Sequence, residues 1–240
     1  MSIVRVADLT KSYDGRTVLD GVNFEVNAGE FVSIIGPSGS GKSTIFNVIA
    51  GLDTADSGVV ASPRSAYMPQ KDLLFPWRSV LDNTALGLEV QGVPKKRARA
   101  TAQELFRVFG LDGYENARPS EMSGGMRQRA AMLRTVVQGH ELLLLDEPFG
   151  ALDSLTRTGM QRWLHDMWLD YGWTVLMITH DIREAVYLSD RVIVLSDKPA
   201  RVRRQVAVPL PRPRDPLIVT TPEFAAIEAE LMNVLVSTDY

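Results

Sequence analysis

Cysteine is absent from the 240-residue sequence, and so are long apolar runs and a marked excess of either charge. Without cysteine there is no disulfide, zinc–cysteine site, iron–sulfur cluster or thiol nucleophile. The 26 basic and 29 acidic residues give a net charge of −3, which removes a general electrostatic case for binding nucleic acid. The most apolar runs, 142–145 and 175–178, are far shorter than the ~18 to 20 residues of a membrane-spanning helix. We therefore expect any role at a membrane to depend on a partner.

The composition that remains is that of a globular protein, with 45% hydrophobic and 23% charged residues. The length fits one compact domain that carries a sizeable subdomain, so we take residues 1–240 as a single domain. Residues 1–10 alternate apolar and polar side chains and include Arg5 and Asp8, unlike the apolar stretch of a secretory signal. We expect no export.

The apolar pattern along the chain predicts two kinds of sheet. Residues 4–9 and 22–26 alternate with period two, which indicates an opening antiparallel sheet. Residues 31–35 form a short apolar run before a Gly-rich loop and a helix, and 142–145 and 174–178 are further candidates for buried strands, with an amphipathic helix between them. Strands that alternate with helices favour an α/β fold with a mostly parallel core sheet.

The rest of the chain divides into a helical stretch and a short tail. Residues 71–138 read mainly as helix, most clearly over 95–109, and we interpret them as a helical subdomain inserted in the core. Residues 192–195 predict one more strand, and 199–216 are rich in Pro and Arg and predict an extended segment. Apolar residues between 224 and 235 predict a terminal helix, so we treat 199–240 as a short C-terminal extension.

Residues 36–43 fit the phosphate-binding pattern G-x-x-x-x-G-K-[ST] between a predicted strand and a predicted helix. In such a loop, backbone N–H groups and the helix N-terminus hold phosphate oxygens. Lys42 should reach the β- and γ-phosphates, and the Ser43 hydroxyl should hold Mg²⁺. The alternative is a plain Gly-Ser turn. The predicted phosphate-binding residues are Gly36, Pro37, Ser38, Gly39, Ser40, Gly41, Lys42, Ser43 and Thr44.

A second motif ends the apolar run 142–145 with two adjacent carboxylates, Asp146 and Glu147, before Pro148. A strand that ends this way places both acids at the carboxyl edge of the sheet, where ligands of α/β folds bind. Asp146 is suited to bind Mg²⁺ through water, and Glu147 is suited to orient or deprotonate an attacking water. By themselves these residues could also be solvated acids at a strand end.

A third motif, residues 122–129, places Ser123, Gly124, Gly125 and Met126 at the start of another predicted helix. A helix N-terminus with exposed N–H groups can bind a second anion. A Ser-Gly-Gly sequence before a helix is also a common cap without any ligand.

These motifs, together with Gln70, residues 151–153 and His180, occur in the order and approximate spacing of ATP-binding cassette (ABC) ATPases, and the resemblance covers nearly the whole chain. It implies the P-loop NTPase fold of ABC ATPases, with a mostly parallel core sheet, an N-terminal antiparallel β-subdomain and an inserted helical subdomain. It also implies ATP and Mg²⁺ as ligands, and a second copy of the chain or a homologous cassette as partner.

The resemblance assigns a role to each motif residue. In the family two cassettes pair head to tail, so Ser123, Gly124, Gly125 and Met126 would contact the nucleotide bound to the other copy, and Asp153 would communicate across the pair. Gln70 would contact Mg²⁺ and the attacking water, His180 the γ-phosphate, and Tyr13 would stack on adenine, although a turn tyrosine can also simply pack on its neighbours. The predicted catalytic residues are Lys42, Gln70, Glu147 and His180, and the predicted metal ligands are Ser43, Gln70 and Asp146.

Residues 122–126, Met-Ser-Gly-Gly-Met, correspond to the signature sequence of the family. They depart from the commoner Leu-Ser-Gly-Gly-Gln at both ends, with Met122 and Met126. Met at the last position resembles importer cassettes. Residues 73–83, which begin Leu-Leu-Phe-Pro-Trp-Arg, are similar to the cassettes of nitrate, taurine and alkanesulfonate importers, which dock a helix of a membrane subunit beside this segment.

Our hypothesis from the sequence is an ATP-hydrolysing subunit of a bacterial importer of a small solute. The resemblance implies multi-span membrane permease subunits as direct partners, an extracytoplasmic solute-binding protein as an indirect one, and a peripheral location on the cytoplasmic face of the inner membrane. One alternative is a non-transport ABC ATPase that acts on nucleic acid or ribosomes. A small-molecule kinase is another, but it would lack the Ser-Gly-Gly signature.

Overall fold

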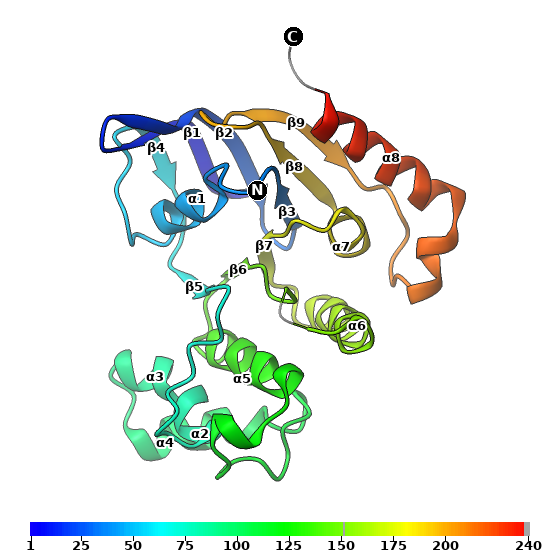
Figure 1. Ribbon diagram of the computed structural model, residues 1–240. Helices are drawn as coiled ribbons and strands as arrows, with labels where there is room; N and C mark the ends of the chain where they lie inside the picture. The colour runs from blue at the N-terminus through cyan, green and yellow to red at the C-terminus, as the bar shows by residue number, and fades with distance from the viewer. Residues whose placement is uncertain (151, 238–240) are drawn as a thin grey trace.

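The computed structural model describes residues 1–150 and 152–237, which contain a small antiparallel sheet and a larger, mostly parallel one (Figure 1). The small sheet has the order β2-β1-β4, formed by β1 (Ser2–Tyr13), β2 (Arg16–Asn27) and β4 (Ser57–Ala61). Asp14 and Gly15 join β1 to β2, and both have positive φ values, of 49° and 74°. Two positive φ values in a two-residue loop give the type I′ turn that suits the twist of a hairpin. This turn places Tyr13 at the very end of β1.

The larger sheet has the order β5-β6-β7-β3-β8-β9. Its strands are β3 (Phe31–Ile35), β5 (Ser65–Met68), β6 (Leu142–Asp146), β7 (Thr174–Ile178), β8 (Arg191–Leu195) and β9 (Val202–Ala207). All neighbours pair in parallel except β8 and β9, which are antiparallel. Every residue of β3, β6 and β7 is buried, as expected for parallel strands covered on both faces. The predicted α/β class with a mostly parallel core and an opening antiparallel sheet is confirmed.

Alternate residues of the central strands face two separate hydrophobic clusters. Leu142 and Leu144 of β6 pack with β1, β2 and α1 (Lys42–Ile49), whereas Leu143 and Leu145 pack on the opposite side. That opposite side is covered by α6 (Ser154–Tyr171), α7 (Ile182–Leu188) and α8 (Pro222–Val236), as Figure 1 shows. Because successive side chains of a strand point to opposite faces, one run of leucines supplies both clusters.

Residues 71–138 contain helices and no strand: α2 (Val80–Thr84), α3 (Leu86–Val90), α4 (Lys95–Glu104), the 3₁₀ turn η1 (Pro119–Glu121) and α5 (Gly124–Val136). In Figure 1 they lie together below the sheets, connected through β5 and β6. The boundaries of a subdomain at 71 and 138 stay a prediction.

The predicted helix over 95–109 is wrong in its last five residues. Helix α4 ends at Glu104, and the N–H groups of Leu105 and Phe106 bond to carbonyls three residues back, which tightens the chain into turns. Phe106 and Phe109 are fully buried, and Gly110 follows with a φ of 62°. The apolar spacing came from a packed turn rather than from a continuous helix.

The remaining segments largely follow the sequence pattern. Strand β9 lies within the predicted extended stretch 199–216, and the 3₁₀ turn η2 (Pro216–Thr220) precedes α8. On α6, the apolar spacing predicts Tyr171 on the same face as Met160, Leu164 and Trp168, but Tyr171 is 48% exposed and stacks on Trp173. Strands β4 and β5 were not predicted. Across 1–150 and 152–237, no helix has both the length and the hydropathy needed to span a bilayer.

Candidate functional site

The carboxyl ends of β3, β5, β6 and β7 meet at one edge of the sheet and border a cavity of about 680 Å³. The predicted phosphate loop follows β3 and ends at Gly41, whose φ is 94° and which forms the N-cap of α1. A Cβ at Gly41 would lie 2.8 Å from carbon atoms of Val18 and Leu19, so the loop can follow this path only with glycine there. The N-terminus of α1 therefore opens into the cavity, where its free N–H groups can bind an anion.

Lys42 lies beneath this loop and is 7% exposed. Its Nζ donates to the carbonyl oxygens of Gly36 at 2.9 Å and Pro37 at 2.8 Å. Burial lowers the pKa of Lys42, and the nearby charges of Glu147 and Asp146 act in the opposite direction. A buried ammonium whose partners are mostly neutral carbonyls is favourably placed for an anionic ligand.

Ser43 and Asp146 form the second part of the site. The Ser43 hydroxyl donates to Oδ2 of Asp146 at 2.9 Å, and the Tyr67 hydroxyl reaches the same oxygen at 3.3 Å. Burial raises the pKa of Asp146, while both hydrogen bonds act to lower it. The pKa of Tyr67 rises to about 12, chiefly through burial and then through the Asp146 charge.

A hydroxyl and a carboxylate are the oxygen donors that Mg²⁺ prefers. Over the described part of the chain, no three His, Cys, Asp or Glu side chains gather in a way that could hold a metal ion. This pair therefore fits a Mg²⁺ ion that has few protein ligands and takes most of its other ligands from phosphate and water.

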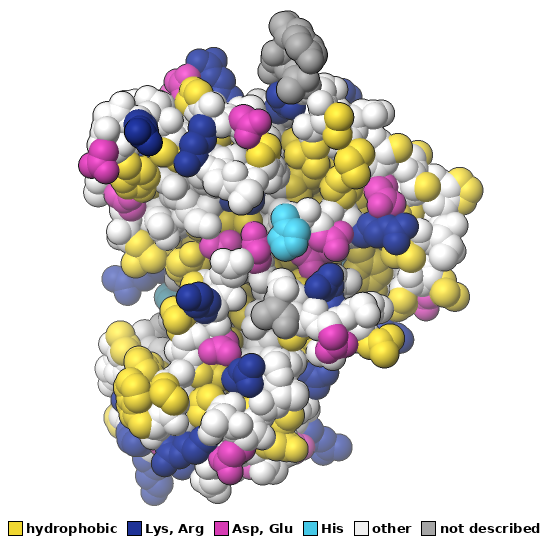
Figure 2. Space-filling view, viewed as in Figure 1, with side chains coloured by type: hydrophobic (Ala, Val, Ile, Leu, Met, Phe, Trp, Pro, Cys, Tyr) yellow, Lys and Arg dark blue, Asp and Glu magenta, His cyan; other side chains and the backbone are white. Residues whose placement is uncertain are grey.

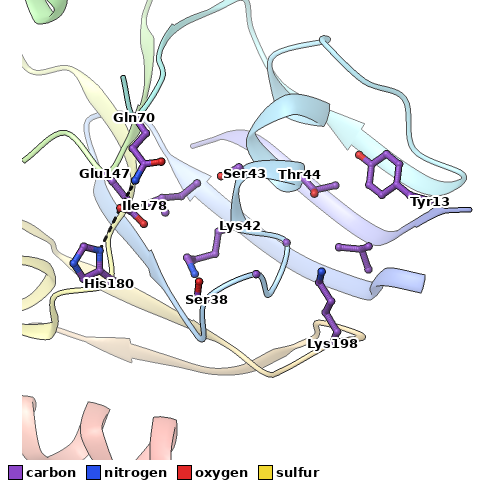
Figure 3. Close-up of a pocket in the computed structure, with 13 residues that line it drawn as sticks. Tyr13, Ser38, Lys42, Ser43, Thr44, Gln70, Glu147, Ile178, His180 and Lys198 are labelled. Carbon is purple, nitrogen blue, oxygen red and sulfur yellow. Dashed lines mark hydrogen bonds and ion pairs between the residues drawn. The ribbon is translucent and has the colours of Figure 1, made fainter. Parts of the chain in front are cut away.

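Glu147 lies at the meeting point of three strand ends (Figure 3). Its Oε2 accepts a hydrogen bond from Gln70 Nε2 at 2.8 Å, and His180 Nδ1 lies 3.3 Å from the same oxygen. Glu147 has a φ of 46°, unusual for a residue with a side chain, and its N–H donates to the Ile178 carbonyl at 2.9 Å. The His180 side chain is 67% exposed, and Figure 2 shows a histidine at the surface between acidic side chains. A carboxylate held in this way can orient a water molecule and accept its proton.

Tyr13 borders the far end of the same cavity, beyond Thr44 (Figure 3). Three cavity residues were not predicted from the sequence: Val18, Ile178 and Lys198. The Lys198 ammonium lies 4.0 Å from where a Cβ on Gly39 would stand, and Figure 3 shows it directed toward the phosphate loop. A basic residue shortly after the predicted strand 192–195 was the one signal that could have identified it.

The signature residues lie outside this cavity. Ser123 caps α5 and accepts from the Met126 N–H at 3.3 Å, and Asp153 caps α6 and accepts from the Thr156 N–H at 3.1 Å. Gly125 faces the start of α6, because a Cβ there would lie 2.7 Å from the Thr156 methyl group. Among the residues that border the cavity there is none of the predicted set Ser123, Gly124, Gly125, Met126 and Asp153. Within one chain, residues 123–126 therefore do not reach the cavity at the phosphate loop.

Comparison with known proteins agrees with this geometry. Residues 19–150 match the family described as ABC transporter. The aliphatic sulfonates import ATP-binding protein 1 of Streptomyces avermitilis is 45% identical over 235 residues, which cover 98% of this chain and 86% of that protein. The formylaminopyrimidine import ATP-binding protein of Halalkalibacterium halodurans is 47% identical over 195 residues, covering 80% and 78%.

Two solved structures are also similar. A dimeric bacterial ABC transporter cassette superposes with a TM-score of 0.76 at 31% identity, and its post-hydrolysis state bound to ADP and Pi gives 0.73 at 30%. Both cover 85% of this chain and 98% of the solved one.

Proposed function

The chain belongs to the ABC transporter family of ATP-binding proteins, and from this premise we propose that it hydrolyses ATP to drive the import of a small solute. The observation that carries the proposal is that a phosphate loop, Ser43 and a Gln70–Glu147–His180 cluster border one cavity. The buried Asp146 accepts a hydrogen bond from the Ser43 hydroxyl beside that cavity. These are the parts that phosphoryl transfer to water requires.

The phosphate loop and α1 would bind the triphosphate of ATP. Backbone N–H groups at the helix N-terminus contact its oxygens, and the buried Lys42 ammonium exchanges neutral carbonyl partners for charged ones. Mg²⁺ would be held by Ser43, Asp146 and Gln70, and when bound it neutralises charge on the phosphates.

Glu147 is the proposed base for the attacking water. It orients the water and takes one proton as the water oxygen bonds to the γ-phosphorus and the bond to the β-phosphate oxygen breaks, which leaves ADP and phosphate. Gln70 and His180 hold the carboxylate at this place, from either side of the Glu147 side chain (Figure 3). His180 is exposed enough to contact the γ-phosphate directly.

A second copy would complete the site. The signature residues Ser123 to Met126 and the cap Asp153 lie outside the cavity of their own chain, so a head-to-tail pair is the arrangement that lets them reach a nucleotide. The solved relatives at 30% and 31% identity are dimeric cassettes, which supports this arrangement.

Permease subunits would bind near residues 73–93. Leu73, Trp77 and Val90 are 58%, 69% and 80% exposed, and Figure 2 shows apolar side chains gathered on the part that holds α2–α5. Exposed apolar side chains of this size favour a protein partner. The relatives named for sulfonate and formylaminopyrimidine import support a small organic solute, supplied by an extracytoplasmic binding protein, and a position on the cytoplasmic face of the membrane.

The test is to tag the chain in its own host, solubilise the membranes in mild detergent and identify the proteins that co-purify. We expect a multi-span permease in equal amount, and its loss in a variant that carries both Leu73→Ser and Trp77→Ser. The double variant Lys95→Ser, Lys96→Ser, which changes exposed residues of α4, is the matched control. Recovery only from the soluble fraction with ribosomal proteins or nucleic acid would contradict the importer assignment.

A further inference from the structure

The Tyr13 side chain is held by a contact outside every motif described above. Its hydroxyl donates to Oδ2 of Asp53 at 2.5 Å, across 40 residues of sequence. Hydrogen bonding to Asp53 raises the pKa of Tyr13, and burial adds to the rise. Tyr13 borders the nucleotide cavity and Asp53 does not.

Asp53 is itself fixed by a cation. Its Oδ1 lies 3.1 Å from Lys11 Nζ, and it also accepts the Thr54 N–H at 2.7 Å. The pKa of Asp53 is lowered by its hydrogen bond from Tyr13 and then by that from Lys11, which keeps it charged at neutral pH. One carboxylate thus joins the tyrosine hydroxyl to an ammonium group.

Lys11 restrains the same ring by a second route. Its side chain is 10% exposed, and Nζ lies 5.2 Å from the Tyr13 ring centroid, within the range of a cation–π contact. The ammonium also donates to the Thr54 carbonyl at 2.8 Å and lies 3.3 Å from Oδ1 of Asp56. The ring is therefore restrained both at its hydroxyl and over its face.

Asp53 and Asp56 lie in the loop that follows α1. The N–H groups of Leu52 and Asp53 bond to the Asn47 carbonyl at 2.8 Å and 3.2 Å, and the Ser12 N–H bonds to Oδ2 of Asp56 at 2.6 Å. Because α1 begins at the phosphate loop, these bonds fix the tip of the β1–β2 hairpin relative to the phosphate end of the cavity.

We propose that Asp53 and Lys11 are positioning residues that hold the Tyr13 ring as the base-facing wall of the nucleotide site, so that they set affinity for the base without touching the nucleotide. The proposal rests on the proposed function, in which the cavity binds ATP with adenine against Tyr13. A ring that is already held in place loses less conformational entropy when a base stacks on it, so the stacking contributes more to binding.

The test compares two ligands by calorimetry on the full chain. The Mg²⁺ complex of a non-hydrolysable ATP analogue carries the base, and Mg²⁺-tripolyphosphate lacks it. We expect Asp53→Ala and Tyr13→Phe each to weaken the analogue roughly three- to tenfold, because part of the stacking is lost. The double variant should be no weaker than the worse single one, because both remove the same link. Tripolyphosphate affinity should stay unchanged throughout, and Asp53→Asn, which keeps an acceptor, should recover part of the loss.

Asp20→Ala is the matched control, since Asp20 is likewise an acidic residue paired with a basic one, Arg201, at 2.5 Å, but it lies on β2 and its side chain bonds to Arg201 rather than to Tyr13. It should change neither affinity. Three results would each overturn the positioning role. The first is an equal loss of affinity for both ligands in Asp53→Ala, and the second is additive losses of analogue affinity in the double variant. The third is wild-type analogue affinity in Asp53→Ala while Tyr13→Phe binds the analogue more weakly.

Tyr13→Ala separates this proposal from the proposed function. If Tyr13→Ala weakens the analogue but Asp53→Ala does not, only the positioning role is wrong. If Tyr13→Ala leaves the analogue at wild-type affinity, the base does not stack there, and the assignment of the base site falls together with the positioning role.

Discussion

The hydroxyl of Ser43 donates to Oδ2 of Asp146 at 2.9 Å, although 103 residues separate them in the chain. Ser43 lies in the first turn of α1, and Asp146 is the last residue of β6. This one hydrogen bond joins the phosphate loop to the strand that carries the proposed catalytic base. A substitution of Ser43 or of Asp146 is therefore expected to affect both the phosphate loop and the position of Glu147.

Replacing the proposed base should separate binding from hydrolysis. Glu147→Gln keeps an acceptor for Gln70 but has no carboxylate to take a proton, so we expect phosphate release to fall about 10²- to 10⁴-fold with nucleotide affinity retained. ATP should then hold two copies together, which size-exclusion chromatography would detect. Glu141→Gln, at the exposed residue just before β6, is the control. Near-normal hydrolysis by Glu147→Gln would disprove the assigned base.

Removing the buried ammonium of Lys42 should weaken nucleotide binding. Lys42→Ala deletes the cation beneath the loop, and we expect nucleotide affinity to fall roughly 10- to 100-fold, the size of a hydrogen bond to a charged group. Binding of a fluorescent ATP analogue measures the change, with the exposed Lys71→Ala as control. Unchanged binding in Lys42→Ala would count against the phosphate-loop assignment.

Lys198, which lies beside Gly39, should make a smaller and salt-dependent contribution. An exposed cation is largely screened, so we expect Lys198→Ala to weaken ATP by at most about fivefold at low ionic strength. The difference from the wild type should shrink as salt is added. A loss that stays constant between low and high salt would rule out a direct charge contact.

Glu184 should make stability depend on pH. Burial raises its pKa from 4.5 to about 7; the Asp181 charge adds to the rise, while Thr179, Gln161 and Arg157 oppose it. The folded protein therefore holds a proton that the unfolded chain releases between these values, and the associated stability is complete below pH 4.5 and is lost as the pH rises through 7.

Urea unfolding of the wild type and of Glu184→Gln at pH 5 and pH 8 measures this effect. We expect the free energy of unfolding of the wild type, relative to the variant, to fall by up to about 3 kcal/mol between the two pH values. Glu223→Gln, at an exposed position on α8, is the control for the loss of a carboxyl group. A relative free energy that rises with pH would contradict the buried, protonated state.

The sequence predicted those parts of the fold whose cause is local. Residues 31–35 and 142–145 are short apolar runs next to glycine or acidic residues, and they form β3 and most of β6. Strand β4 escaped prediction because four of its five residues are exposed, so the strand depends on pairing with β1 rather than on its own pattern. Glu147 was found because it directly follows a predicted strand. Gln70 and His180 were found through the resemblance to ABC ATPases, since Gln70 follows β5, which the sequence pattern did not predict.

The contacts around Tyr13 were not predictable in this way. Asp53 has no pattern that distinguishes it from any other loop acid, and its partners Lys11 and Tyr13 lie about 40 residues away. The helix predicted over 95–109 extends too far for a related reason, since Phe106 and Phe109 have helical spacing but pack within a turn. Tertiary contacts decide both cases.

The parallel strands that end at one edge also determine which genetic changes the protein can accept. Exchanges among apolar residues of similar volume inside β3, β6 or β7 cost less than about 1.5 kcal/mol each, so the identity of these residues can drift. Inserting or deleting one residue is different, because it moves everything beyond it by about 3.3 Å and turns it to the opposite face. Glu147 follows β6 immediately, so such an indel would carry it away from Gln70 and His180. Strand length should therefore be under stronger selection than strand composition.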